Sequence, residues 1–212
     1  MLKLVMRRGA IKPYCGYSLT ELLVACGLAS IVISAVATQA ARSHIAHSSI
    51  QHANSVEDDI RALQSTITQH LSKAGFVYSP NTLSPFGATT IENTVFEVTT
   101  GHRANEPENS CVTFSYDKNK DGVVSLAQGE FFGYRLHDNA IEYRVAGHTC
   151  IQSGWYDLTD TQTTVATKFT VNRRHSSSWG SAYEIEIELH SKVDPTVKSA
   201  RTFIVEAVNA YY

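Results

Sequence analysis

The sequence predicts an α+β protein in which one long N-terminal helix packs on a mainly antiparallel β-sheet. Three observations predict this class. A charge-free apolar run lies near the N-terminus, a helical stretch without proline or glycine continues to Gly75, and short β-branched and aromatic segments follow Pro80. The chain has 212 residues, of which 43% are hydrophobic and 18% charged. This composition suits one modest folded domain with a specialised N-terminus.

Residues 1–16 form a short basic leader. It carries Lys3, Arg7, Arg8 and Lys12 and no acidic residue. Without the leader, fourteen basic residues remain against twenty acidic ones, so the formal net charge changes from −2 to about −6. Such a mature chain argues against binding of nucleic acid through bulk positive charge.

Residues 17–41 are predicted to form a membrane-spanning helix. Twenty uncharged residues lie between Glu21 and Arg42. At about 1.5 Å rise per residue they span about 30 Å, the thickness of one bilayer core. Because four basic residues precede the run and Arg42 alone directly follows it, the N-terminal end is expected in the cytoplasm, with the anchor in the inner membrane and the rest of the chain outside the cytoplasm.

Two other export signals compete with this interpretation. In an ordinary secretory signal the apolar stretch precedes the cleavage site, whereas here it follows every plausible early site. A lipoprotein signal is suggested by the sequence LVAC, which ends at Cys26. However, its apolar region would be short and would contain Glu21, and the chain after Cys26 continues as an apolar segment instead of a polar tether.

The sequence GYSLTEL, from Gly16 to Leu22, resembles the processing site of type IV prepilins. In that family a membrane aspartyl prepilin peptidase cuts after the glycine and N-methylates the new terminus. The resemblance therefore implies cleavage between Gly16 and Tyr17, and a small residue at this bond lets the backbone enter a protease site closely. It also implies the prepilin peptidase, other major and minor pilins and the pilus assembly platform as partners.

Glu21 is a carboxylate at the edge of the apolar run, where a charge is costly and normally functional. Cleavage creates a positive amine on Tyr17, four residues earlier, and an anion in the first helical turn also favours the helix dipole. In the pilin family this glutamate pairs with the N-terminus of a neighbouring subunit during assembly. The alternative is an interfacial glutamate without a partner.

Residues 42–75 are predicted to continue the helix as an amphipathic segment. Apolar residues recur mostly at three- and four-residue spacing, at Ile45, Val56, Ile60, Leu63, Ile67 and Leu71. The whole helix is expected from about Ser18 to about Ala74, ending at Gly75. Its histidines are His44, His47, His52 and His70. The sequence offers no third ligand that would make a metal site with His44 and His47, so the histidines are expected on a solvated polar face.

Residues 76–212 are predicted to form a β-rich domain in the periplasm, later at the cell surface. The chain there alternates in polarity, and the sequences KNKDG and HDNA supply turn chemistry. Cys111 and Cys150 both lie in this exported domain, where disulfides persist. A bridge would close a loop of about forty residues and stabilise the fold by about 3–4 kcal/mol. The alternative is two buried free thiols.

The sequence DKNKDGVVSLAQGE has two interpretations. As a calcium loop it would take oxygen ligands from Asp117, Asn119, Asp121, Val123 and Glu130. However, position twelve of such a loop should be a bidentate glutamate and is Gln128. The second interpretation, which we favour, is a solvated hairpin turn. No cofactor is required, and calcium is the one candidate.

A second polar stretch combines basic and aromatic residues, with Arg173 and Arg174 before Trp179. Such residues can hold a DNA backbone and stack a base. An exposed hairpin loop is the favoured interpretation, so DNA is not expected as a partner. No catalytic constellation is evident in the sequence, and an enzyme is not expected.

Leader, motif and helix together resemble minor type IV pilins of the PilW/PulJ-like group, and the YDxNxDG stretch is similar to one in a branch related to the prepilin peptidase-dependent proteins. The resemblance implies the pilin fold and a structural subunit that primes pilus assembly and sits at or near the pilus tip. Two alternatives are a J-class pseudopilin of a type II secretion system and a membrane-tethered binding module that does not polymerise. Adhesion, motility and DNA uptake all stay open as roles of the pilus.

Overall fold

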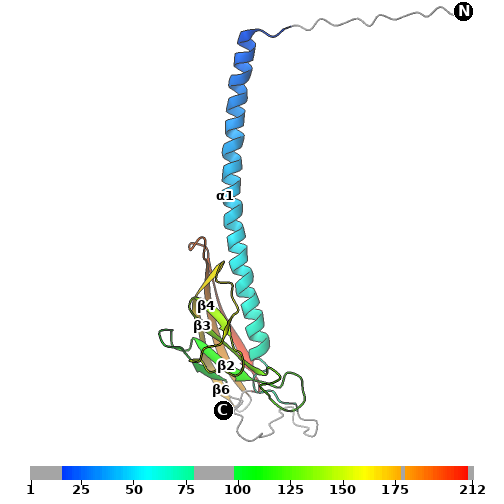
Figure 1. The fold of residues 1–212 in the computed structure, drawn as a ribbon, viewed down its shortest axis with the longest axis vertical. Coiled ribbons are helices and arrows are strands. Elements are labelled where there is room, and N and C mark those ends of the chain that lie inside the picture. Colours follow the sequence, from blue (N-terminus) through cyan, green and yellow to red (C-terminus); the bar gives the residue numbers. More distant parts are fainter. Residues whose placement is uncertain (1–15, 79–97, 178–179, 210–212) are drawn as a thin grey trace, which may run out of the picture. The chain divides into compact units, whose positions relative to one another are not determined.

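The computed structural model describes residues 16–78, 98–177 and 180–209 (Figure 1). The chain divides into two compact units, Met1–His47 and Ser48–Tyr212. Helix α1, Leu19–Leu71, belongs to both units, and antiparallel strands follow it. The predicted α+β class is therefore confirmed. Residues 1–15 of the predicted leader lie outside the described residues.

In the first unit, α1 begins directly after Ser18, whose carbonyl accepts the N–H of Leu22 at 3.1 Å. The helix contains one stretch that is long and apolar enough to cross a membrane, by length and composition. The hydroxyl side chains of this stretch are compatible with a membrane. Ser30, Ser34 and Thr38 each donate to the carbonyl oxygen three residues earlier, so their hydroxyls are paired within the helix.

In the second unit, the buried side of α1 carries the apolar residues that the periodicity indicated: Val56, Ile60, Leu63, Ile67 and Leu71. The helix stops at Leu71, three residues before the expected end. There the N–H groups of Lys73 and Ala74 bond to carbonyls three residues back, which tightens the last turn. Gly75 follows with φ of 78°, and its N–H bonds to Ser115 O at 2.9 Å.

The strands form two sheets instead of the single sheet expected. Sheet A contains β1 Thr99–Gly101, β2 Cys111–Ser115, β3 Phe131–His137, β4 Ala140–Tyr143 and β5 Tyr156–Asp157, in that order. Sheet B contains β6 Thr164–Ser177, β7 Gly180–Ser191 and β8 Lys198–Ala207. All neighbouring strands are antiparallel.

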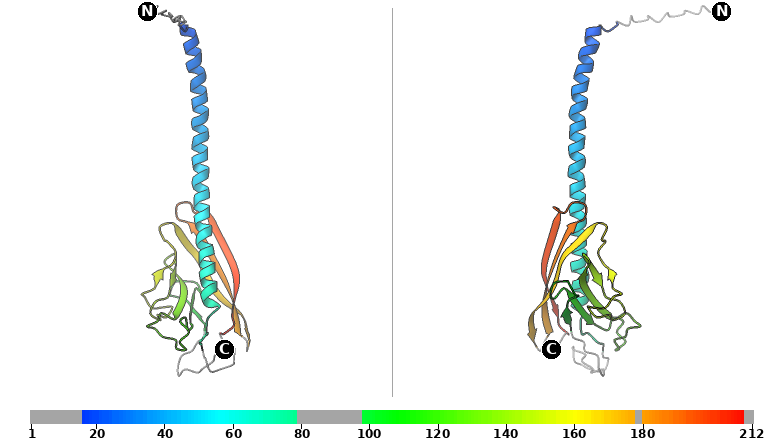
Figure 2. Two further views of the ribbon diagram at one scale, coloured as in Figure 1. Left: turned by 90° about the vertical axis from the view of Figure 1, so that its right-hand side faces the viewer. Right: turned by 60° about the vertical axis from the view of Figure 1, so that its left-hand side comes forward.

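Strand β7 shows why sheet B has one buried and one open face. Its inward residues, Tyr183, Ile185, Ile187 and Leu189, are buried, whereas the glutamates between them are half-buried or exposed. This alternation is typical of an antiparallel sheet with one face on the core. Figure 2 shows the second half of α1 beside both sheets, and the apolar residues of all three form one core.

Candidate processing and assembly site

The proposed cleavage bond lies in chain without regular structure. Gly16, Tyr17 and Ser18 precede α1, and Tyr17 is 85% exposed. A Cβ at Gly16 would have no atom within 4 Å. The bond between Gly16 and Tyr17 is therefore accessible to a peptidase, which is the local condition for processing.

Glu21 lies in the first turn of α1, three residues after Ser18. This spacing matches the S-x-x-E pattern that begins many helices, and the carboxylate faces the positive end of the helix dipole. Ser18 itself bonds to the hydroxyl of Thr20 at 2.9 Å. Glu21 shares an open hollow on one helix face with Val24 and Leu28, so a charge directly adjoins an apolar surface.

The surface beyond Glu21 is apolar and exposed. In the described part of the chain the large apolar side chains of this stretch are all more than half exposed: Leu22, Leu23, Val24, Leu28, Ile31, Val32, Ile33 and Val36. A contiguous apolar surface of this length requires a membrane or neighbouring helices to cover it. The geometry therefore provides an accessible bond, a first-turn carboxylate and an apolar anchor, one after the other.

The second unit, Ser48–Tyr212, contains the disulfide that the sequence suggested. Cys111 on β2 is bonded to Cys150, with a Cα–Cα distance of 6.0 Å. Arg135 supports the segment around Cys150: its guanidinium donates to Cys150 O at 2.8 Å and to Gln152 O at 2.7 Å. The same side chain forms a buried ion pair with Glu142 at 2.5 Å. The loop after β4 is therefore held to sheet A both by the disulfide and by the hydrogen bonds that the buried Arg135 side chain donates.

The acidic loop is organised around two buried carboxylates, Asp117 (1% exposed) and Glu130 (0% exposed). Asp117 accepts four backbone N–H groups, those of Tyr78, Lys120, Asp121 and Gly122, at 2.6–3.3 Å. Glu130 accepts three more, those of Lys118, Asn119 and Ser125. These bonds join the chain after α1 to the end of β2 and to the whole loop.

The other predicted calcium ligands lie on the exposed side of this loop. Asp121 accepts the Asn119 amide at 2.9 Å, the Gln128 amide at 2.7 Å and the Val123 N–H at 2.9 Å. These bonds, that from Asn119 foremost, lower the pKa of Asp121. Among the described residues, no three His, Cys, Asp or Glu side chains are grouped closely enough to hold a metal ion. Every carboxylate oxygen of Asp117 and Glu130 already has an N–H donor. The hairpin turn stays the favoured prediction, and calcium binding stays its untested alternative.

The basic stretch that was considered as a DNA contact, with an exposed hairpin loop as the favoured interpretation, is only partly described. Arg174 on β6 forms an ion pair with Glu184 on β7 at 2.8 Å. Arg173 lies on the same strand, and Trp179 lies outside the described residues. The Arg174 charge is thus already matched within sheet B.

His70 does not lie on a solvated face, so that expectation is wrong for this residue. It packs among the rings of Phe132, Tyr116 and Tyr134, the nearest centroid at 4.9 Å, and its buried Nδ1 atom has no hydrogen-bond partner among the described residues. Burial, with Lys73 and Lys118 nearby, lowers the pKa of His70. The helical spacing from Ile67 and Leu71 is the signal that would have indicated partial burial.

Comparison with known proteins agrees with this arrangement. Residues 49–207, about three quarters of the chain, match a family described as prepilin peptidase-dependent protein B. The prepilin peptidase-dependent protein B of Escherichia coli (strain K12) is 21% identical over 197 residues, which cover 92% of this chain and 96% of that protein. No solved structure matches the chain.

Proposed function

Because the chain belongs to the prepilin peptidase-dependent protein B family, we propose that it is a minor type IV pilin. Prepilin peptidase cuts it between Gly16 and Tyr17 and methylates the new amine. Before assembly, the mature subunit is anchored in the inner membrane with its β-rich domain in the periplasm. It then primes pilus assembly and takes a place at or near the tip, among other pilins and on the assembly platform. The role is structural and requires neither catalysis nor a cofactor.

One observation carries this proposal: Glu21 sits in the first helical turn between an accessible Gly16–Tyr17 bond and an exposed apolar helix. A carboxylate in that position is expensive in a membrane unless it meets a positive charge. Processing creates such a charge at the amine of Tyr17. In an assembly of parallel helices, the amine of one subunit can reach the carboxylate of the next, so anchoring and assembly use the same segment.

Mass spectrometry of the membrane-extracted protein tests the first step. The expected mature chain begins with N-methylated Tyr17. Gly16→Val should block cleavage because a branched side chain obstructs the scissile backbone, whereas Leu2→Val in the leader should leave it unchanged. A mature chain that begins at lipidated Cys26 would overturn the proposal.

The amount of the protein in sheared pili tests the second step. Co-purification with pili, and loss of piliation on deletion, are expected of a priming minor pilin. A processed protein that stays in the membrane and leaves piliation unchanged would indicate a tethered binding module instead.

A further inference from the structure

The free side of β8 is a long strand edge without a partner among the described residues (Figure 2). Sheet A ends in strands of three and two residues, whereas β8 has ten. The other outer strand of sheet B is partly covered, because Ala166 and Val171 donate their N–H groups to carbonyls outside the sheet. Long uncovered edges invite another strand, and proteins usually shorten or cover them. Here β1, β5 and β6 follow that rule and β8 does not.

The ladder register shows which groups of β8 are available. Ser191 N bonds to Val197 O at 2.9 Å, which makes this a hydrogen-bonded pair at the end of the β7–β8 ladder. The register continues without a shift. Since hydrogen-bonded and non-hydrogen-bonded pairs alternate, the odd-numbered residues of β8 bond to β7. The outward N–H and C=O groups belong to Lys198, Ala200, Thr202, Ile204 and Glu206.

The side chains of these residues also suit a strand partner. All five are exposed, and Ile204, a β-branched apolar residue in the second half of the strand, is 61% exposed. The strand contains no proline and no bulge against β7. An added strand would cover Ile204 while bonding to the outward backbone groups of its neighbours.

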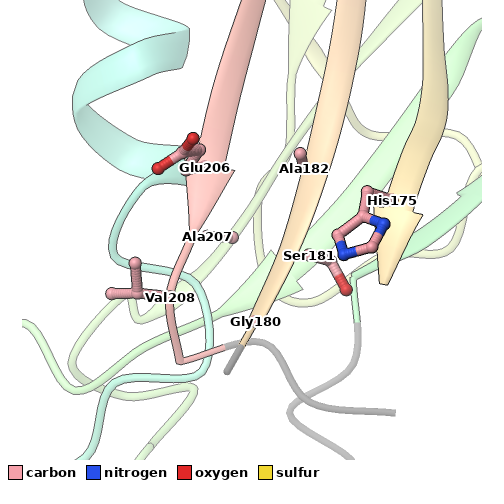
Figure 3. Close-up of a pocket in the computed structure, with 7 residues that line it drawn as sticks. All are labelled: His175, Gly180, Ser181, Ala182, Glu206, Ala207 and Val208. Carbon is pink, nitrogen blue, oxygen red and sulfur yellow. The ribbon is translucent and has the colours of Figure 1, made fainter. Parts of the chain in front are cut away.

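A cavity of about 290 Å³ lies where β8 ends, lined by His175, Gly180, Ser181, Ala182, Glu206, Ala207 and Val208 (Figure 3). His175, Ala182 and Glu206 are cross-strand neighbours on β6, β7 and β8. The small Ala182 leaves space between the two larger side chains. Glu206 has no ion pair with any described residue. The cavity therefore offers an unmatched carboxylate to a cationic side chain.

We propose that β8 accepts an extended segment of a second, different pilin-like subunit as an added strand, with a basic side chain of that segment in the cavity beside Glu206. In such recognition the main-chain bonds provide affinity and a side-chain pocket provides selectivity. The inference rests on the proposed function, because co-assembly in one membrane brings the two subunits together.

A second copy of this chain fits the edge less well. Glu57 on α1 bonds to Ser199 and Arg201, so helix and β8 are linked side by side. Two-fold antiparallel pairing of two β8 strands would reverse α1 in one copy relative to the other. Two copies whose Ser48–Leu71 helix segments run in the same direction cannot adopt that pairing.

Site-specific photo-crosslinking of the full-length chain tests the inference. A benzoylphenylalanine at Ile204 is expressed with prepilin peptidase and, one at a time, with each other protein of the same cell that has a prepilin cleavage motif. We expect a cross-link to one of them, and none from the control position Val123, which is 52% exposed on the acidic loop. Thr202→Pro removes one outward N–H and should lower the yield about tenfold, because an acceptor of the partner loses its donor.

Two matched variants separate recognition from folding. Arg201→Pro removes an N–H that bonds to β7, so this variant should lose protease resistance, whereas Thr202→Pro should keep it because proline is tolerated at outward edge positions. Glu206→Gln should lower the cross-link yield and abolish its decrease with added salt. Processing at Gly16 is measured in every strain.

A folded, processed Thr202→Pro chain that cross-links like the wild type would overturn strand addition. A Glu206→Gln chain with unchanged yield and salt dependence would overturn the basic side chain in the cavity. Cross-linking only to a second copy, or to none of the pilin-like proteins despite normal processing, would overturn the choice of partner. A chain that is not processed at all would refute the proposed function instead.

Discussion

Replacing Asp117 with asparagine should strongly destabilise the second unit, Ser48–Tyr212. Asp117 is almost completely buried, and its two carboxylate oxygens accept two backbone N–H groups each. In Asp117→Asn one oxygen becomes an NH₂ group. In either orientation of the side-chain amide, two backbone N–H groups lose their acceptor and lie against the new NH₂ group, which is itself a donor.

The magnitude follows from these contacts. A hydrogen bond to a charged group contributes about 1.5–3 kcal/mol, and a buried donor without an acceptor adds its own penalty. Two such bonds are lost in Asp117→Asn, so the free energy of unfolding should fall by about 3–5 kcal/mol. For a protein of this size that corresponds to a melting temperature lower by about 10 °C.

Thermal unfolding of the full-length protein in detergent, followed by near-ultraviolet circular dichroism, measures this effect. The matched control is Asp121→Asn, because Asp121 lies on the exposed side of the same loop and should cost less than about 1 kcal/mol. Both variants and the wild type are measured with a chelator and with millimolar calcium. If the loop is a hairpin held by its own N–H donors, calcium leaves all three melting temperatures unchanged.

Two results would refute this reasoning. If Asp117→Asn melts within a degree or two of Asp121→Asn, the four N–H bonds do not stabilise the loop as argued. If calcium raises the wild-type melting temperature and either substitution removes the increase, the loop binds the ion and the hairpin interpretation is wrong.

Three further predictions concern other parts of the chain. Thiol labelling of the denatured, unreduced protein should find Cys111 and Cys150 unreactive, and their reduction should cost about 3–4 kcal/mol of stability; labelling of both would contradict the disulfide. Burial lowers the pKa of His70 from its ordinary value of 6.5, so the unfolded state binds the proton more readily. The free energy of unfolding should therefore fall as the pH drops from about 7 to 5. His70→Phe should lose that part of the pH dependence, and an unchanged pH profile would contradict the prediction. Glu21→Ala should still insert and be cleaved but be depleted from sheared pili, because a neighbouring amine is left unpaired; wild-type incorporation would show that Glu21 is only an interfacial residue.

Several features were determined by local sequence alone. The order of leader, GYSLTEL motif and apolar run needs no tertiary contact, because a peptidase and a membrane act on consecutive residues. The amphipathic half of α1 follows from the spacing of residues such as Ile60 and Ile67, since helical geometry converts spacing directly into a face. Alternation in β7 likewise determines which side of that strand is buried.

Only the tertiary structure determined which of these elements pack against or pair with one another. Alternation assigns a face to each strand but not a neighbour, so the division into two sheets and the free edge of β8 became apparent only from the ladders. The same holds for single side chains. Asp117 and Glu130 are of a residue type that binds metals, yet both are buried and together accept seven backbone N–H groups. His70 was expected at the surface from the sequence pattern, but it packs against three aromatic rings. The physical reason is that hydrogen bonding and burial depend on groups brought together from distant parts of the chain, whereas a motif records only its own neighbours.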